Sequence, residues 1–333
     1  MKNIFTFLFF VFITNSVFAQ SNVFKITASA DVPTTLLVKR PDLVSQTIDT
    51  INIENKDLKK TISLDQPQAA ILETDQQQVM IWMIPGYSLH VKIENNQLVF
   101  GGQAALYADY FQNKQNNFIN FCHYYYQRNP TFNENAKGYR DFLDSVTVQQ
   151  VNYFKKYFIN NRSNFVKQFM EEETASLYYE NLSRKLMFGD MALENFKPYQ
   201  KINGLQSAAY YPYSEKVSFT NPALLKIYFF QQFAGQFVAE VSLKKQKELS
   251  PEFNFPQYLD IAMQSIDKLT GEGPTAEPIK AIFIVRVIEE MERNNKTEWS
   301  EGLNSLLSNL VKKTGNTYIL QLKERLGALS PAE

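Results

Sequence analysis

Cysteine and histidine are nearly absent from this sequence, which excludes most familiar kinds of catalytic and metal site. Its 333 residues contain one cysteine, Cys122, and two histidines, His90 and His123. A single cysteine rules out an internal disulfide framework, a C-x-x-C redox pair and a thiolate metal cluster. The two histidines form no H-x-x-x-H pair, and no glycine-rich phosphate loop or G-x-S-x-G motif is present. We therefore expect no bound cofactor or metal, and no catalysis by this chain alone.

The adjacent Cys122 and His123 do not amount to a nucleophile and its base. Neighbouring residues on a helix point about 100° apart, so they do not face one another. The alternative reading is a cysteine packed as a small apolar side chain near Phe118 and Phe121.

Net charge is also absent, because 34 Lys and Arg residues balance 34 Asp and Glu residues. Such a chain has no overall field to attract nucleic acid or an anionic membrane. Glycine is scarce, with 12 residues, whereas phenylalanine (27) and tyrosine (18) are abundant. This balance favours aromatic-rich packing, and the length is sufficient for two domains.

The N-terminus is typical of a secretory signal peptide. Lys2 is followed by an apolar run, Ile4 to Ile13, and Val17 and Ala19 occupy the positions that signal peptidase reads. We expect residues 1–19 to be removed and the mature protein to be exported to the periplasm or beyond. No cysteine lies near the cleavage site, so we expect no lipid anchor. No later apolar run is long enough to span a membrane.

Residues 20–102 are expected to form a β-sandwich. The clearest signal is an apolar run from Val79 to Ile84, a Pro85-Gly86 turn, and an alternating strand with Leu89, Val91 and Ile93 on one face. Short strands with turn signals between them, and no crossover helices, predict a mostly antiparallel sandwich. The expected strands are 23–28, 34–40, 45–53, 60–64, 68–73, 79–84, 89–94 and 98–100.

From residue 103 to 326 the apolar period becomes helical. Asn221-Pro222 predicts a helix start, and an apolar stripe follows at spacings of four (Leu225, Phe229, Phe233, Phe237, Val241). The expected helices are 104–127, 138–160, 164–188, one from 221, 256–269, 277–293, 298–312 and 317–326, and residues 327–333 are expected to be a tail or linker. The predicted fold class is α+β in two segregated parts, with an N-terminal antiparallel β-sandwich followed by an all-α helical array.

Tyrosine clusters are the candidate binding residues. Tyr210, Tyr211 and Tyr213 lie in an irregular stretch, and tyrosine suits interfaces with sugars or peptides. The alternative is that they close the edge of a core, and the same holds for Tyr124 to Tyr126. The acidic runs Glu171 to Glu173 and Glu289 to Glu292 are expected to be solvated helix faces.

One window resembles a known family. Ile84-Pro85-Gly86-Tyr87-Ser88-Leu89-His90-Val91, followed by Phe100-Gly101-Gly102-Gln103-Ala104-Ala105, is similar to the N-terminal region of TlpA-type thiol–disulfide oxidoreductases exported by Bacteroidetes. Tyr87 stands where that family usually has Asp. The resemblance implies a β-sandwich, a helical region and then a thioredoxin-like domain carrying C-x-x-C. No residue here matches that motif, so no catalytic residue carries over. Loss of the domain, its presence as a separate polypeptide, and a truncated sequence remain open.

Two functions follow as hypotheses, and a third ranks below them. The first is a non-catalytic exported module that binds a periplasmic protein or a small ligand. The alternative is the accessory region of a thiol–disulfide oxidoreductase, with a thioredoxin-like partner supplying the redox chemistry. An unrecognised enzyme would need carboxylates or tyrosines converging with shifted pKa values.

Overall fold

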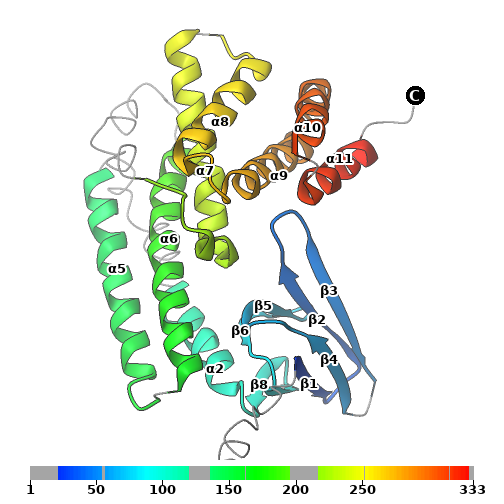
Figure 1. The fold of residues 1–333 in the computed structure, drawn as a ribbon. Helices are drawn as coiled ribbons and strands as arrows, with labels where there is room; N and C mark the ends of the chain where they lie inside the picture. The colour runs from blue at the N-terminus through cyan, green and yellow to red at the C-terminus, as the bar shows by residue number, and fades with distance from the viewer. Residues whose placement is uncertain are drawn as a thin grey trace, which may run out of the picture. The chain divides into compact units, whose positions relative to one another are not determined.

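The computed structural model describes residues 22–54, 57–119, 136–161, 163–195, 217–250, 252–314 and 316–329. The chain divides into two compact units (Figure 1). The sandwich unit comprises Met1–Pro41 and Gln46–Asn117, and the helical unit comprises Asp42–Ser45 and Phe118–Glu333. The expected α+β class with segregated strands and helices is confirmed.

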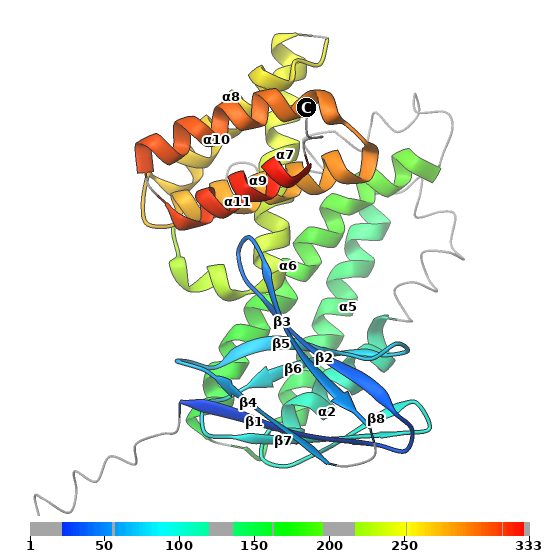
Figure 2. The same ribbon diagram turned by 90° about the vertical axis from the view of Figure 1, so that its right-hand side faces the viewer.

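The sandwich unit contains two four-stranded sheets, seen as two layers of strands in Figure 2. One sheet has the order β4-β1-β7-β8 and the other has the order β3-β2-β5-β6. The strands are β1 (Val23–Ala30), β2 (Thr34–Pro41), β3 (Gln46–Ile53), β4 (Leu58–Ser63), β5 (Gln68–Glu73), β6 (Gln78–Met83), β7 (Ser88–Glu94) and β8 (Gln97–Gly101). Alternating residues are buried, as in β1, where Phe24, Ile26 and Ala28 are inaccessible to solvent.

Strand pairing is antiparallel with one exception, so the expectation of a mostly antiparallel sandwich is confirmed. Strand β1 pairs with β4 antiparallel on one side and with β7 parallel on the other. In the parallel pair, Lys25 lies opposite Ser88 and Ala30 lies opposite Ile93. The first strand is therefore held by strands that come much later in the chain.

Helix α2 (Ala105–Lys114) belongs to the sandwich unit, which runs to Asn117. Tyr107 of α2 places its ring 5.2 Å from that of Trp82 on β6. The turn into α2 needs Gly102, because its φ of +88° is a conformation that side chains disfavour. A Cβ at this position would also lie 2.8 Å from the backbone oxygen of Ser88.

Asp49 on β3 links the two sheets at the side of the sandwich away from α2, where β3 and β4 are the edge strands. Its carboxylate lies 2.9 Å from Arg40 on β2 and 3.0 Å from Lys60 on β4. Burial alone would raise the pKa of Asp49, but the hydrogen bonds from Lys60 and Arg40 outweigh burial and lower it. The charged form of Asp49 therefore stabilises the fold.

The helical unit is built around α7 (Tyr228–Leu249), which packs against α6, α8 and α9. The other described elements are η1 (Gln115–Ile119, which straddles the boundary of the two units), α5 (Ala136–Tyr157), α6 (Asn164–Asn195), η3 (Pro222–Lys226), α8 (Phe255–Thr270), α9 (Ala276–Asn294), η4 (Thr297–Trp299), α10 (Ser300–Thr314) and α11 (Thr317–Leu329). None of the described helices combines the length and apolar character needed to cross a membrane.

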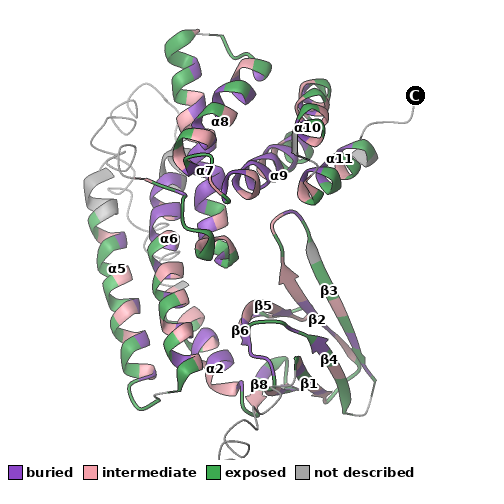
Figure 3. Ribbon diagram, viewed as in Figure 1, coloured by how far each residue is buried: buried purple, intermediate pink, exposed green. Residues whose placement is uncertain are grey.

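Aromatic rings fill the core around α7, whose middle is buried (Figure 3). Phe233 and Phe237 of the predicted stripe are buried, with ring centroids 5.5 Å apart. Phe219 packs edge-on against Phe230 and Phe237 at 5.6 and 6.0 Å. Such contacts add to the apolar area that drives folding.

Most predicted helices agree with the structure within a few residues, but two local predictions were wrong. Asn221 does cap a helix, its side chain accepting from the Ala223 N–H, but that helix is the short η3 and α7 begins only at Tyr228. Gly189-Asp190 does not end α6, which continues to Asn195. A glycine costs a helix about 1 kcal/mol, too little to stop one of this length. Of the predicted helix 104–127, residues 120–127 lie outside the described residues.

We predict that Gly102→Ala lowers the free energy of unfolding of the sandwich unit by about 2–4 kcal/mol, from backbone strain and the close contact with Ser88. Gly101→Ala is the matched control, because its Cβ would meet only the His90 Cβ at 3.6 Å; its effect should stay within about 0.5 kcal/mol. The measurement is urea unfolding in a Trp299→Phe background, where Trp82 is the only remaining tryptophan. Equal effects of the two substitutions would contradict the assignment.

Asp49→Asn should lower the free energy of unfolding by about 0.5–1 kcal/mol at pH 7, since the ion pairs are partly exposed. The folded pKa lies below the usual 3.8, so the stabilisation is present above that value and is lost as pH falls through the folded pKa. The difference between the variant and the native chain should therefore vanish in acid. Asp65→Asn, at an exposed turn, serves as control and should show no such convergence.

Candidate functional site

A polar groove lies on the sandwich unit where β5 turns into β6. Its volume is about 370 Å³. The lining residues come from β2, the end of β5, the β5–β6 turn and the start of β6: Thr35, Leu37, Glu73, Thr74, Asp75, Gln76, Gln77 and Gln78. Amides, hydroxyls and carboxylates dominate this set, with Leu37 as its apolar member.

The groove forms because β2 extends beyond the end of β5. Strand β2 pairs with β3 along its whole length, from Thr34 opposite Ile53 to Pro41 opposite Gln46. On its other side it pairs with β5 only from Leu37 to Lys39. Among the described strands, none pairs with residues 34–36 on that side. The turn after β5 curls toward β6 and leaves this part of β2 as one wall of the groove.

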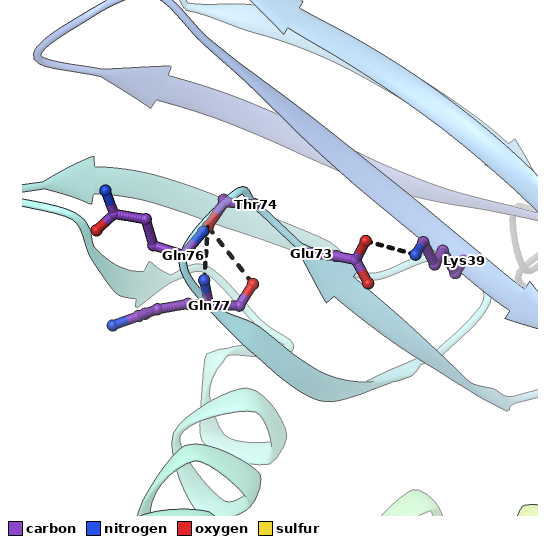
Figure 4. A network of polar contacts seen from close by, with 5 residues as sticks. All are labelled: Lys39, Glu73, Thr74, Gln76 and Gln77. Atoms are coloured by element: carbon purple, nitrogen blue, oxygen red, sulfur yellow. Dashed lines mark hydrogen bonds and ion pairs between the residues drawn. The ribbon is translucent and has the colours of Figure 1, made fainter.

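Thr74 holds the turn that forms the opposite wall (Figure 4). Its hydroxyl oxygen accepts from the backbone N–H of Gln77 at 3.1 Å, and its own N–H donates to the Gln77 carbonyl at 2.8 Å. Threonine hydroxyls commonly support turns in this way. The tip residues Asp75 and Gln76 are left exposed.

Glu73 lines the groove and forms an ion pair with Lys39, whose Nζ lies 2.5 Å from the Glu73 carboxylate (Figure 4). The two side chains come from adjacent strands, β5 and β2. The pair places opposite charges side by side, so the groove presents hydrogen-bonding groups with little net charge apart from Asp75. Such a surface suits a neutral polar ligand better than a strongly charged one.

Gln77 supports the groove from behind. Its Oε1 accepts the backbone N–H of Leu98 on β8 at 3.2 Å, and the Nε2 of Gln112 on α2 donates to the Leu98 carbonyl at 3.0 Å. Leu98 is buried, so both main-chain groups would otherwise lie buried without a partner. The β5–β6 turn is thereby attached to Leu98 of β8, the residue to which Gln112 of α2 also donates a hydrogen bond.

The groove lining carries two carboxylates, Glu73 and Asp75, among hydroxyl and amide side chains. Histidine, cysteine and lysine are absent from the lining itself, although Lys39 lies beside Glu73, and the described residues hold no cluster of three or more metal-ligand side chains. Clear pKa shifts arise elsewhere: burial raises the pKa of Asp109 on α2 and of Tyr258 on α8. Hydrogen bonding is the interaction that most of the lining side chains can make.

Most of the sequence-predicted site residues are not among those that the structure describes. Tyr210, Tyr211 and Tyr213 lie outside the described residues, as do Cys122, His123 and Tyr124 to Tyr126. His90 is described and is an exposed residue of β7, next to Gly101 and Gly102. No signal in the sequence singles out the groove residues, because each is a polar side chain of a kind common on protein surfaces. Only the pairing of β2 with β5 brings them together.

Charged groups within the helical unit are more deeply buried than expected. The prediction that Glu171 to Glu173 form a solvated face was wrong at Glu173, which is only 3% exposed. Helix α6 packs against α5 on one side and α7 on another, so little of its circumference faces solvent. Lys185 of the same helix is also buried, and its Nζ lies 2.5 Å from Asp144 on α5. Glu289 and Glu292 are exposed, as predicted.

Lys280 on α9 is a second buried cation with acidic partners. Its Nζ lies 2.9 Å from Asp267 on α8 and 3.0 Å from Glu277. Burial alone would lower the pKa of Lys280, but the hydrogen bonds with the two carboxylates outweigh burial and raise it. We assign Lys185 and Lys280 to packing, because each has a carboxylate partner on a neighbouring helix.

Comparison with known proteins identifies no relative: no family model, curated protein or solved structure matches this chain.

Gln77→Ala should lower the free energy of unfolding of the sandwich unit by about 1–2 kcal/mol, because it leaves the buried Leu98 N–H without a partner. Gln76→Ala, one position away and exposed, should change it by less than about 0.5 kcal/mol. Urea unfolding compares the two. Equal stability of both variants would show that the Gln77 amide does not hold the turn to β8.

Proposed function

We propose that this protein is a non-catalytic binding module and that the groove of the sandwich unit accepts an extended, uncharged peptide segment from a partner protein. The single observation that carries the proposal is the part of β2, residues 34–36, that borders the groove without a second strand beside it. A peptide there would lie between the turn residues and the half-buried Thr34 and Thr35, whose main chain could pair with it, whereas Leu36 is fully buried.

The groove chemistry supports a peptide ligand in two ways. An added strand gains main-chain hydrogen bonds from the edge it joins, whatever its sequence. The amides of Gln76 and Gln78 supply donors and acceptors that suit peptide groups, and Leu37 supplies one apolar contact. The carboxylate of Glu73 has Lys39 beside it, so a charged ligand is not required to neutralise it.

The proposal also includes a cellular location, the periplasm, and an alternative function linked to thiol–disulfide chemistry. The signal-like residues 1–19 support export, with the partner met in the periplasm. The alternative function is that of an accessory region to a thiol–disulfide oxidoreductase. The feature that favours it is the TlpA-like window, residues 84–105, which spans the β6–β7 turn, β7, β8 and the turn into α2.

The test is a titration followed by backbone-amide NMR. The probe is a pool of random, uncharged pentapeptides, acetylated and amidated at their ends. At about 1 mM peptide, we expect shifts concentrated at residues 34–37 and 75–78, with an affinity in the weak range of short peptides. A thioredoxin-like domain as a second probe tests the alternative function.

The matched variants exploit glutamines at both ends of β5. Gln76→Ala with Gln78→Ala should weaken binding at least threefold. Gln66→Ala with Gln68→Ala alters a similar pair at the far end of the strand and should leave binding unchanged. Shifts located elsewhere, or equal loss in both double variants, would contradict the groove as the peptide site.

A further inference from the structure

The sandwich has four sheet edges, and three of them are protected by visible devices. Strand β8 has the Leu98 main-chain groups covered by the amides of Gln77 and Gln112. Strand β6 is covered by α2, which packs against it. Strand β4 carries Lys59 and Lys60, and lysine on an edge strand opposes pairing with another chain.

Strand β3 forms the fourth edge and has neither a covering helix nor a lysine of its own, although Lys60 of β4 reaches its Asp49. Its sequence, QTIDTINI, is rich in β-branched residues and contains neither lysine nor proline. It pairs with β2 alone, and no described residue hydrogen-bonds the side of its backbone that faces away from β2. Ile48 is 51% exposed, and Thr50 and Asn52 are also exposed. Part of the β3 ribbon is accordingly green in Figure 3.

We infer that β3 pairs antiparallel with β3 of a second copy of this chain, which joins two four-stranded sheets into one of eight strands. Charge favours a second copy over a charged partner. The whole chain has no net charge, and the single charge on β3, Asp49, is matched by Arg40 and Lys60. Opposed β-branched side chains make favourable cross-strand pairs.

Symmetry narrows the register of this pairing. Residues directly opposite one another in an antiparallel sheet point to the same face. A residue near the middle of β3 must therefore lie opposite the same residue of the second copy, with the two-fold axis between them. The central candidates are Asp49 and Thr50. An axis at Asp49 would place two carboxylates opposite one another, which is unfavourable. An axis at Thr50 places Thr50 opposite its own copy and Asp49 opposite Ile51.

The experiment is sedimentation velocity on the full chain across a range of concentrations. We expect a reversible dimer, because one strand edge buries less area than a typical stable interface. Thr50→Lys and Thr50→Glu each place like charges opposite one another and should raise the dissociation constant about tenfold or more. An equimolar mixture of the two variants should restore the dimer, as opposite charges then meet.

Val99→Lys is the matched control. Val99 is 47% exposed and lies on β8, the edge that Gln77 and Gln112 protect, so this variant should dimerise like the native chain. Circular dichroism checks that each variant is folded. A native chain that stays monomeric up to about 0.2 mM would overturn the proposal. So would equal weakening by Val99→Lys, or a mixture of the Thr50 variants that fails to associate.

Discussion

Unpaired main-chain groups at the edges of β-sheets are the constraint on which this sandwich depends. An edge strand exposes a row of N–H and C=O groups that need water, a side chain or another strand. At Leu98 the need is met by two glutamine amides, one from the β5–β6 turn and one from α2. The same contacts fix the turn that walls the groove and hold the start of β8 beside α2. Edge protection and the shape of the candidate site thus arise from one set of hydrogen bonds.

The helical unit solves a different problem, the burial of charged side chains beside an apolar core in which aliphatic residues outnumber the aromatic rings. Around α7, the rings of Phe219, Phe230 and Phe237 exclude water and supply the apolar area that folding requires. The buried Lys185 and Lys280 each receive a carboxylate from a neighbouring helix. Such pairs contribute little to stability when intact, but removing one partner would leave a buried charge without compensation.

Much of the fold could be predicted from sequence, because its signals are local. Alternation and turn residues located all eight strands within about two residues, and helical periods with caps located most helices. Strand order was not predictable: the parallel pairing of Lys25 with Ser88 depends on contacts far apart in the chain. Glu173 was misread because its burial reflects packing of α6 on two sides. The groove was missed for the same reason as the strand order, since Thr35 and Gln76 meet only through the β2–β5 pairing.

The parallel pairing of β1 with β7 also sets an order of events during synthesis and folding. The hairpins β2–β3 and β5–β6 join neighbouring segments and can form as soon as each pair has emerged. Strand β1 is made first, yet its central position between β4 and β7 stays incomplete until Ser88 to Ile93 exist. Until then its apolar residues, Phe24, Ile26 and Ala28, have only part of their final environment. A nascent chain that stalls before β7 would carry this segment unprotected, and it would be the first recognition point for a chaperone or a protease.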